Sequence, residues 1–150
     1  MSSSAVQVAV LAGSRSDQAI IDEVDKALTE LGVGHEVRVI SAHRNPEALR
    51  RYVSGSQAKV FVAIAGLAAH LPGVVASMTV RPVIGVPVAA KLDGLDSLLS
   101  IVQMPPGVPV SAVGVDNGRN GGILAAEILA ITDSTIQKNL EKMRDAWRQQ

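Results

Sequence analysis

Three short stretches of this 150-residue chain combine small, polar and ionisable residues in a way that could bind a ligand. They read Gly-Ser-Arg-Ser-Asp at 13–17, Ser-Ala-His-Arg-Asn-Pro at 41–46 and Ala-Gly-Leu-Ala-Ala-His-Leu-Pro-Gly at 65–73. The first joins a predicted strand to a predicted helix, where free backbone N–H groups and the helix dipole favour an anion. Asp17 would repel a phosphate, but its carboxylate can accept hydrogen bonds from ribose hydroxyls. The alternative is a plain helix cap, in which Ser16 or Asp17 satisfies the first turn.

The second and third stretches each carry a histidine. His43 stands beside Arg44, so an imidazole that can move a proton lies next to a cation that can hold a phosphate or carboxylate. A capped turn before Pro46, with a surface histidine and arginine, is the alternative. His70 lies among small residues, and it is a second proton carrier, an orienting group or a hydrogen-bonded structural residue. His35 falls early in a predicted strand, and we expect it to be structural.

The composition argues against several other classes of function. The 14 basic and 14 acidic side chains balance, so no net charge attracts nucleic acid or an anionic membrane. Aromatic residues make up 2%, too few for a base-stacking platform. The chain has no cysteine and no pair of histidines at metal-ligand spacing, which disfavours a metal site. It also lacks the Walker sequence of a P-loop and the GxSxG elbow of a serine hydrolase. Residues 61–90 contain no uninterrupted apolar run long enough to span a membrane, and the first residues lack the pattern of a signal peptide. We therefore expect a cytoplasmic protein that acts on a small molecule.

Strand and helix patterns alternate along the chain without a linker or repeat, which predicts a single catalytic domain over residues 1–150. Short apolar or alternating runs predict strands at 8–11, 35–40, 60–65, 83–86 and 110–115. Helical spacing predicts helices at 20–31, 46–54, 68–78, 96–102, 120–131 and 133–148, the last capped by Thr132 or Asp133. This alternation indicates an α/β fold with a parallel sheet of about five strands and helices on both faces. Ligands of such sheets bind beyond the carboxyl ends of the strands, where the three stretches lie.

The three stretches resemble a known family when they are taken together with two further segments, PVIGVPV at 82–88 and DSLLSIVQMPPGVPV at 96–110. That family is the N5-carboxyaminoimidazole ribonucleotide mutases, the class I PurE proteins. The resemblance follows the order of the chain and covers nearly all of it. It implies a three-layer sandwich of flavodoxin-like or Rossmann-like form, assembled as a homo-octamer. It also implies an isomerase of purine biosynthesis that acts on a ribonucleotide without metal, ATP or organic cofactor.

The resemblance also assigns residues. It implies that His43 is the catalytic histidine, and that Ser41 and Arg44 lie on the phosphate side of the site. The full set of implied substrate-binding residues is Ser14, Ser16, Asp17, Ser41, Arg44, Ala65, Gly66, His70 and Leu71. The chain departs from common members at Leu67, at Asn45 and in the glycine-rich segment 116–122, and Leu67 could reshape the pocket edge.

Two other functions stay open from the sequence. One is direct carboxylation of aminoimidazole ribonucleotide by carbon dioxide; members with that activity tend to read SAHK and AGRSN-LSG, whereas this chain reads SAHR and AGLAAHLPG. The other is a non-catalytic nucleotide-binding module of flavodoxin-like shape. Such a module would explain the 13–17 loop, but not why His43 and Arg44 stand together.

Overall fold

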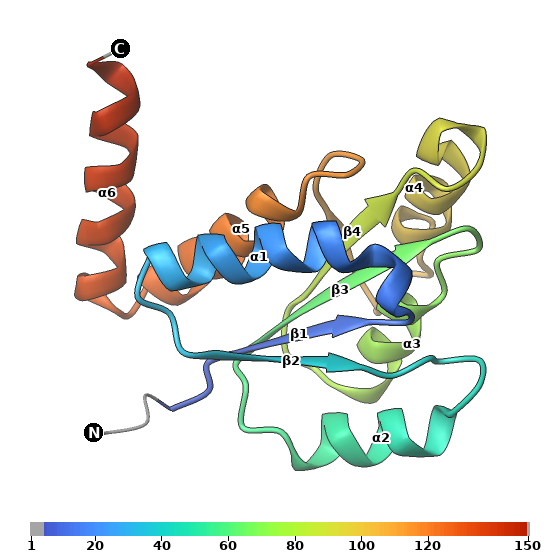
Figure 1. Ribbon diagram of the computed structural model, residues 1–150. Helices are drawn as coiled ribbons and strands as arrows, with labels where there is room; N and C mark the ends of the chain where they lie inside the picture. The colour runs from blue at the N-terminus through green and yellow to red at the C-terminus, as the bar shows by residue number, and fades with distance from the viewer. Residues whose placement is uncertain (1–4, 150) are drawn as a thin grey trace.

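A computed structural model describes residues 5–149 and shows a five-stranded sheet in the order β2-β1-β3-β4-β5 (Figure 1). The strands are β1 (Val8–Ala12), β2 (His35–Val39), β3 (Val60–Gly66), β4 (Val83–Val88) and β5 (Ser111–Ala112). All neighbouring strands are parallel, and Val10 lies opposite Val37 on one side and Val62 on the other. The predicted parallel α/β sheet is therefore confirmed.

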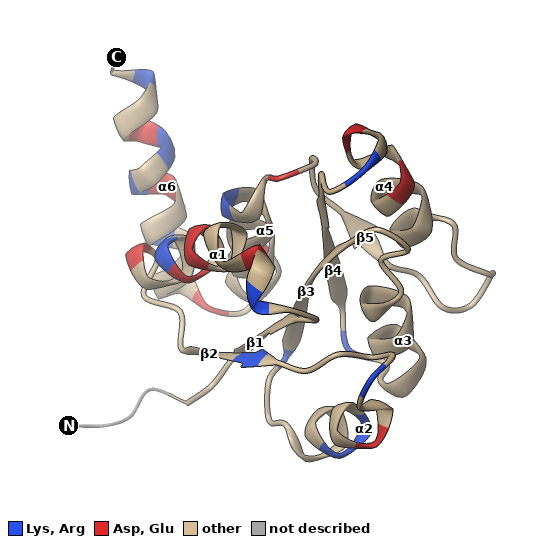
Figure 2. Cartoon of the chain, turned by 45° about the vertical axis from the view of Figure 1, so that its right-hand side comes forward, with Lys and Arg blue, Asp and Glu red and all other residues tan. Residues whose placement is uncertain are grey.

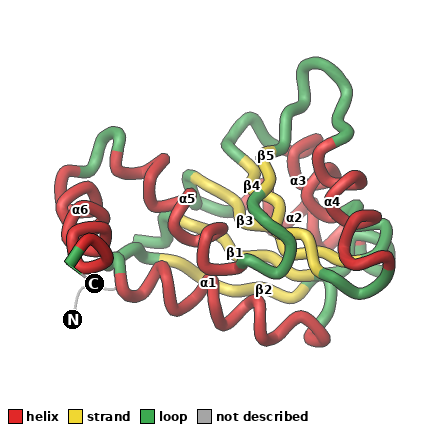
Figure 3. Tube along the Cα trace, turned by 90° about the horizontal axis from the view of Figure 1, so that it is seen from above, coloured by secondary structure: helices red, strands yellow, loops and turns green. Residues whose placement is uncertain are grey.

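Helices cover both faces of the sheet. They are α1 (Gln18–Glu30), α2 (Pro46–Gly55), α3 (Leu71–Met78), α4 (Leu95–Val102), α5 (Gly118–Ala130) and α6 (Ser134–Arg148), with short 3-10 turns η1 (Arg15–Asp17) and η2 (Leu92–Gly94). One buried cluster joins α1, α5 and α6 to the sheet, and a second joins α2, α3 and α4 to the opposite face. Figures 1 and 3 show α6 beside α5 at one end of the molecule, away from the loops that follow β1 and β3. No helix within residues 5–149 is long and apolar enough to cross a membrane.

The strands without charge form the buried centre of the fold. β1, β3 and β4 contain no Asp, Glu, Lys or Arg, and nearly every residue in them is buried (Figure 2). Continuous apolar runs suit strands that are covered on both faces, because neither face meets water. Charged residues gather instead on α1, α2 and α6.

The glycine-rich segment 116–122 lets α5 lie close to its neighbours. A Cβ on Gly121 would stand 2.7 Å from Val86 Cγ2, and a Cβ on Gly122 would stand 3.0 Å from Ala27 Cβ. Glycine at these positions therefore allows close contact of α5 with the sheet and with α1. The glycines of this segment are therefore a packing feature of the chain.

Two predicted elements are wrong in their extent. The fifth strand is assigned only at Ser111–Ala112, because an extra residue interrupts its pairing: Val113 N–H donates to Gly85 O, but Asp116 rather than Val115 donates to Pro87 O. The third helix begins at Leu71 instead of residue 68. The preceding turn cannot be helical, since Leu67 and Ala69 have φ values of 56° and 40°.

Candidate active site

The carboxyl ends of β1, β2 and β3 meet at one edge of the sheet. The chain passes from β1 outward to β2 and then back across β1 to β3, so α1 and α2 cover opposite faces. A reversal of this kind opens a crevice between the loops at the strand ends. A pocket of about 320 Å³ lies there, lined by the loops after all three strands and by Ala90.

The structure brings all of the residues proposed from the sequence to this pocket. Its lining includes Ser14, Ser16, Asp17, Ser41, His43, Arg44, Ala65, Gly66, His70 and Leu71. It also includes Gly13, Ala42, Leu67, Ala68, Ala69 and Ala90. Ala90 was missed because it follows β4 and carries no polar group; its position at the same sheet edge was the available signal.

The first loop is capped differently from the sequence expectation. Ser14 Oγ, not Ser16 or Asp17, accepts the capping hydrogen bond, from Ser16 N at 3.2 Å, and it also accepts from Ser16 Oγ at 3.0 Å. Asp17 makes no side-chain cap bond, although it precedes α1. Its carboxylate is therefore available to the pocket.

Asp17 is held in a setting that disfavours its charge. Burial raises the pKa of Asp17 above its usual range, and the Asp116 carboxylate adds to the rise, while the Ser16 hydroxyl opposes it. An ionised carboxylate in this setting gains from new hydrogen-bond donors. Ribose hydroxyls are donors of that kind.

The second loop fixes a cation at the pocket. Asn45 Oδ1 caps α2 by accepting from Ala48 N at 3.2 Å, and Pro46 occupies the first turn. Ser41 Oγ accepts from Arg44 N at 3.2 Å and from Arg44 Nε at 3.4 Å. Arg44 is exposed and forms no ion pair within residues 5–149, so its guanidinium can receive an anion.

The third loop brings His70 into contact with His43. Nε2 of His43 lies 2.6 Å from Nδ1 of His70, and the two rings are perpendicular, at 88°, with centroids 4.7 Å apart. A hydrogen bond between two ring nitrogens needs one donor and one acceptor, so a single proton lies between them. The sequence placed both histidines in the pocket but did not predict this contact.

The backbone around His70 explains how it reaches His43. Ala69 N–H donates to Gly66 O at 2.9 Å, closing a turn whose left-handed residues redirect the chain before α3. His70 then precedes α3, and its carbonyl accepts from Val74 N at 2.9 Å. The histidine is thus tied to a helix start instead of a free loop.

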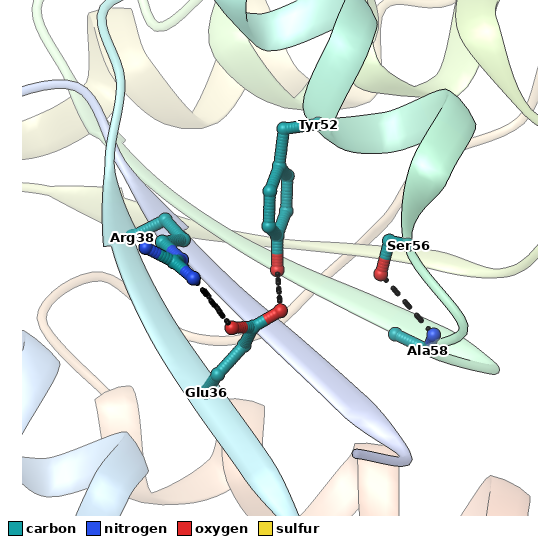
Figure 4. A network of polar contacts seen from close by, with 5 residues as sticks. All are labelled: Glu36, Arg38, Tyr52, Ser56 and Ala58. Atoms are coloured by element: carbon teal, nitrogen blue, oxygen red, sulfur yellow. Dashed lines mark hydrogen bonds and ion pairs between the residues drawn. The ribbon is translucent and has the colours of Figure 1, made fainter.

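Polar groups elsewhere on β2 serve the fold. His35 Nδ1 lies 2.8 Å from Val33 O and its Nε2 lies 2.9 Å from Asp25 Oδ1, which agrees with the structural role expected for it. On the other face of the strand, Tyr52 OH donates to Glu36 at 2.7 Å, and Glu36 also accepts from Arg38 (Figure 4). Burial raises the pKa of Tyr52, so its hydroxyl stays a donor.

The arrangement suits proton transfer to a bound anion. It provides a histidine pair sharing one proton, an adjacent guanidinium, and loop hydroxyls and backbone N–H groups. Within the part of the chain that the structure describes, no group of three His, Asp or Glu residues could hold a metal ion.

Comparison with known proteins agrees with this geometry. The N5-carboxyaminoimidazole ribonucleotide mutase of Methanocaldococcus jannaschii is 59% identical over 138 residues, which cover 92% of this chain and 88% of that protein. The mutase of Pyrococcus abyssi is 50% identical over 143 residues, covering 93% and 82%. A crystal structure of a PurE2 variant from Treponema denticola matches with a TM-score of 0.86 at 25% identity, over 97% of this chain and 92% of that one. A family model described as AIR carboxylase matches residues 7–150, and the chain belongs to that family.

Proposed function

We propose that this protein is an N5-carboxyaminoimidazole ribonucleotide mutase of purine biosynthesis. The observation that carries the proposal is the His43–His70 contact in a pocket that also contains Arg44. The names of the close relatives support the same activity. The enzyme would convert the N5-carboxy ribonucleotide to its 4-carboxy isomer.

The proposed reaction moves one carboxyl group and one proton. The bond between the exocyclic nitrogen and the carboxylate breaks, carbon dioxide is released into the pocket, and the nitrogen takes a proton. The electron-rich ring carbon then attacks the carbon dioxide, and its own proton leaves. Atoms and charge balance within the substrate, so the reaction consumes no ATP and no other co-reactant.

His43 is the proposed proton carrier for both transfers. Histidine is the side chain that enzymes most often use to give and take a proton. His70 shares a proton with Nε2 of His43 and so orients the His43 ring. This arrangement leaves the other nitrogen of His43 for the substrate.

The remaining pocket residues are proposed to bind and confine the substrate. Arg44 and Ser41 would hold the 5′-phosphate with the N–H groups of the first loop, and Asp17 would accept from the ribose. Ala65, Gly66 and Leu71 form an apolar part of the lining. Carbon dioxide has no charge to pair, so a small apolar wall can retain it beside the ring, which raises its effective concentration.

The alternative within the family is direct carboxylation of aminoimidazole ribonucleotide. The loops favour the mutase, because the chain carries Arg44 and the run Ala68–Gly73 instead of the residues typical of carboxylases. The test is turnover of unlabelled N5-carboxy substrate in ¹³C-bicarbonate. We expect mostly unlabelled product and poor reaction of aminoimidazole ribonucleotide with bicarbonate. Label entering the product as fast as product forms, with aminoimidazole ribonucleotide the better substrate, would establish the carboxylase.

The same assay separates an enzyme from a non-catalytic nucleotide-binding module. Enzyme at a concentration far below that of the substrate should convert many equivalents, followed by the ultraviolet absorbance of the aminoimidazole. A module would bind the ribonucleotide and convert none. The histidine contact favours the enzyme, since nucleotide binding alone does not need a shared proton.

A homo-octamer is the proposed assembly. The outer side of η2 and α4 exposes Leu92, Leu95, Leu99 and Val102, at 74%, 55%, 46% and 42% of their surface. A row of exposed apolar residues of this kind is typical of a contact between subunits. Light scattering should give eight times the 15.6 kDa chain mass, and a monodisperse monomer at micromolar concentration would contradict the assembly.

The proposal also places the enzyme in the cytoplasm. Its substrate carries two charged groups, a phosphate and a carboxylate, and molecules with such groups do not cross a bilayer unaided. Fractionation of cells that produce the protein should recover it with cytoplasmic enzymes.

A further inference from the structure

Asp116 lies behind the pocket and ties together two segments that border it. It occupies the left-handed region, with φ of 57°, just before α5. Its backbone N–H donates to Pro87 O at 2.9 Å, and its Oδ1 accepts from Ala89 N at 2.9 Å. Residues other than glycine are uncommon in this conformation, and aspartate is one of the types that adopt it more often.

The segment that Asp116 holds is the β4 loop, residues 89–94. Ala90 of this loop lines the pocket, and its Cβ would lie 3.5 Å from a Cβ built on Gly66. At the far end of the loop, Gly94 has φ of 81° and packs so closely on Val115 that an added Cβ would stand 2.4 Å from Val115 Cγ1. Asp116 and its neighbour Val115 therefore fix both ends of a loop that closes one side of the pocket.

Ser97 supports the same loop from α4. Its buried hydroxyl contacts Val88 O at 3.0 Å and Gly94 O at 2.9 Å. The hydroxyl thus bridges the residue before the loop and the last residue of the loop. Within residues 5–149, the side-chain hydrogen bonds to this loop are thus those of Ser97 at Gly94 and of Asp116 at Ala89, one at each end.

The negative charge of the Asp116 carboxylate contributes to the raised pKa of Asp17, after burial of Asp17 itself. The other charged surroundings of Asp116 are Glu23, Lys26 and Arg119, which line the adjoining hollow. Two of these are engaged elsewhere: Glu23 accepts from Gly118 N at 3.0 Å, and Arg119 pairs with Glu30 at 2.9 Å. On the pocket side, His43 and Arg44 share the lining with Asp17.

We propose that Asp116 is a positioning residue for the substrate: its carboxylate binds Ala89 N–H and so holds the β4 loop, with Ala90, at the wall of the pocket. The inference rests on the proposed function, because Asp17 is there the group that meets the ribose. Asp116 touches no substrate in this scheme. It acts through the β4 loop and through the field at Asp17.

The test compares Asp116→Ala and Asp116→Asn with Asp93→Ala. Asp93 is a matched control, because it lies in the β4 loop itself, has a left-handed φ of 54°, and makes no side-chain hydrogen bond or ion pair within residues 5–149. Both alanine variants carry the same left-handed backbone. We expect Asp116→Ala to raise KM for the N5-carboxy substrate about tenfold with kcat changed less than about threefold, as for loss of one ordering hydrogen bond. Asp116→Asn keeps an oxygen that can accept from Ala89 N–H, so it should raise KM less than Asp116→Ala does. Asp93→Ala should leave KM unchanged.

The pH profile separates the charge from the hydrogen bond. Removing the negative charge at Asp116 lowers the pKa of Asp17, so the acid limb of kcat/KM should move to lower pH in both Asp116 variants and stay in place in Asp93→Ala. Should Asp116→Ala fail to fold, Asp116→Asn alone decides the question by this shift.

Two results would overturn the inference: Asp116→Ala matching Asp93→Ala in KM, or an acid limb that does not move in Asp116→Asn. A wild-type protein that turns over no substrate would refute the proposed function instead. In that event calorimetric binding of aminoimidazole ribonucleotide to the same three variants tests the positioning role, with weaker binding expected only for Asp116→Ala and, to a lesser degree, Asp116→Asn.

Discussion

Replacing the two pocket histidines one at a time should give unequal losses of activity, although they touch. His43→Asn removes the proposed proton carrier, whereas His70→Asn removes the group that orients it across the 2.6 Å contact. Both residues are exposed, so neither change leaves a buried cavity. Losses in activity can then be attributed to chemistry and not to folding.

The sizes follow from the two roles. Loss of a general acid–base residue typically lowers a rate by about 10²–10⁴-fold. Loss of one hydrogen bond weakens an interaction by about 0.5–1.5 kcal/mol, which is at most about a tenfold effect on rate. We therefore expect kcat to fall by two or more orders of magnitude in His43→Asn, and by about tenfold or less in His70→Asn.

The double variant tests whether the pair acts as a unit. If His70 works only through His43, its loss has no further effect once His43 is gone, and His43→Asn/His70→Asn should be as slow as His43→Asn alone. The assay is the conversion of N5-carboxy substrate followed by ultraviolet absorbance, with binding of the ribonucleotide measured separately to confirm that the pocket is intact.

Three results would refute this reasoning. A His43→Asn enzyme with most of its activity would remove it as proton carrier. A His70→Asn loss as large as the one expected for His43→Asn would make His70 a catalytic group in its own right. Losses that multiply in the double variant would show that the two histidines act independently.

Three further predictions concern the anion site, the acidic side of the pocket and the core. Arg44→Ala should weaken binding of the ribonucleotide by about ten- to a hundredfold, measured by calorimetry, and leave binding of the dephosphorylated riboside almost unchanged; equal losses would exclude a phosphate contact. Burial raises the pKa of Asp17, so ionisation of its carboxyl destabilises the folded state as the pH rises through that pKa. Asp17→Asn should therefore raise Tm at pH 7. This gain in Tm should vanish at acid pH, where the carboxyl of the native protein is protonated. Gly85→Ala would place a Cβ 2.4 Å from Ile101 Cγ2, and this overpacking should lower the free energy of unfolding by about 1–3 kcal/mol in urea titration.

Most of the fold follows from residues whose local pattern agrees with their final burial. The runs at β1, β3 and β4 are apolar throughout, and their burial on both faces is what such runs require. The sequence predicts Thr132 or Asp133 as the cap of the last helix, and the cap is Asp133, whose Oδ1 accepts from Thr135 N and Ile136 N. Local rules succeed where the interactions that decide the structure are themselves local.

The predictions from sequence fail where residues distant in the chain determine the backbone conformation. The end of β5 is governed by Pro87 and Ala89, which bind Asp116 from another strand and its loop. Nothing within five residues of Asp116 in the sequence shows that its carboxylate has a partner on β4. The strand prediction for 110–115 therefore read the apolar residues correctly and missed the extra residue in the pairing.

The site shows the same division between placement and contact. Parallel topology alone brings the loops after β1, β2 and β3 to one edge, so a sequence pattern that identifies the strands also identifies the pocket residues. Which atoms meet inside the pocket depends on backbone geometry that the pattern does not contain. His43 and His70 touch because Leu67 and Ala69 turn the chain through left-handed conformations, which neither residue type favours. Backbone strain of this kind persists only where surrounding contacts enforce it, and here it places the imidazole of His70 against that of His43.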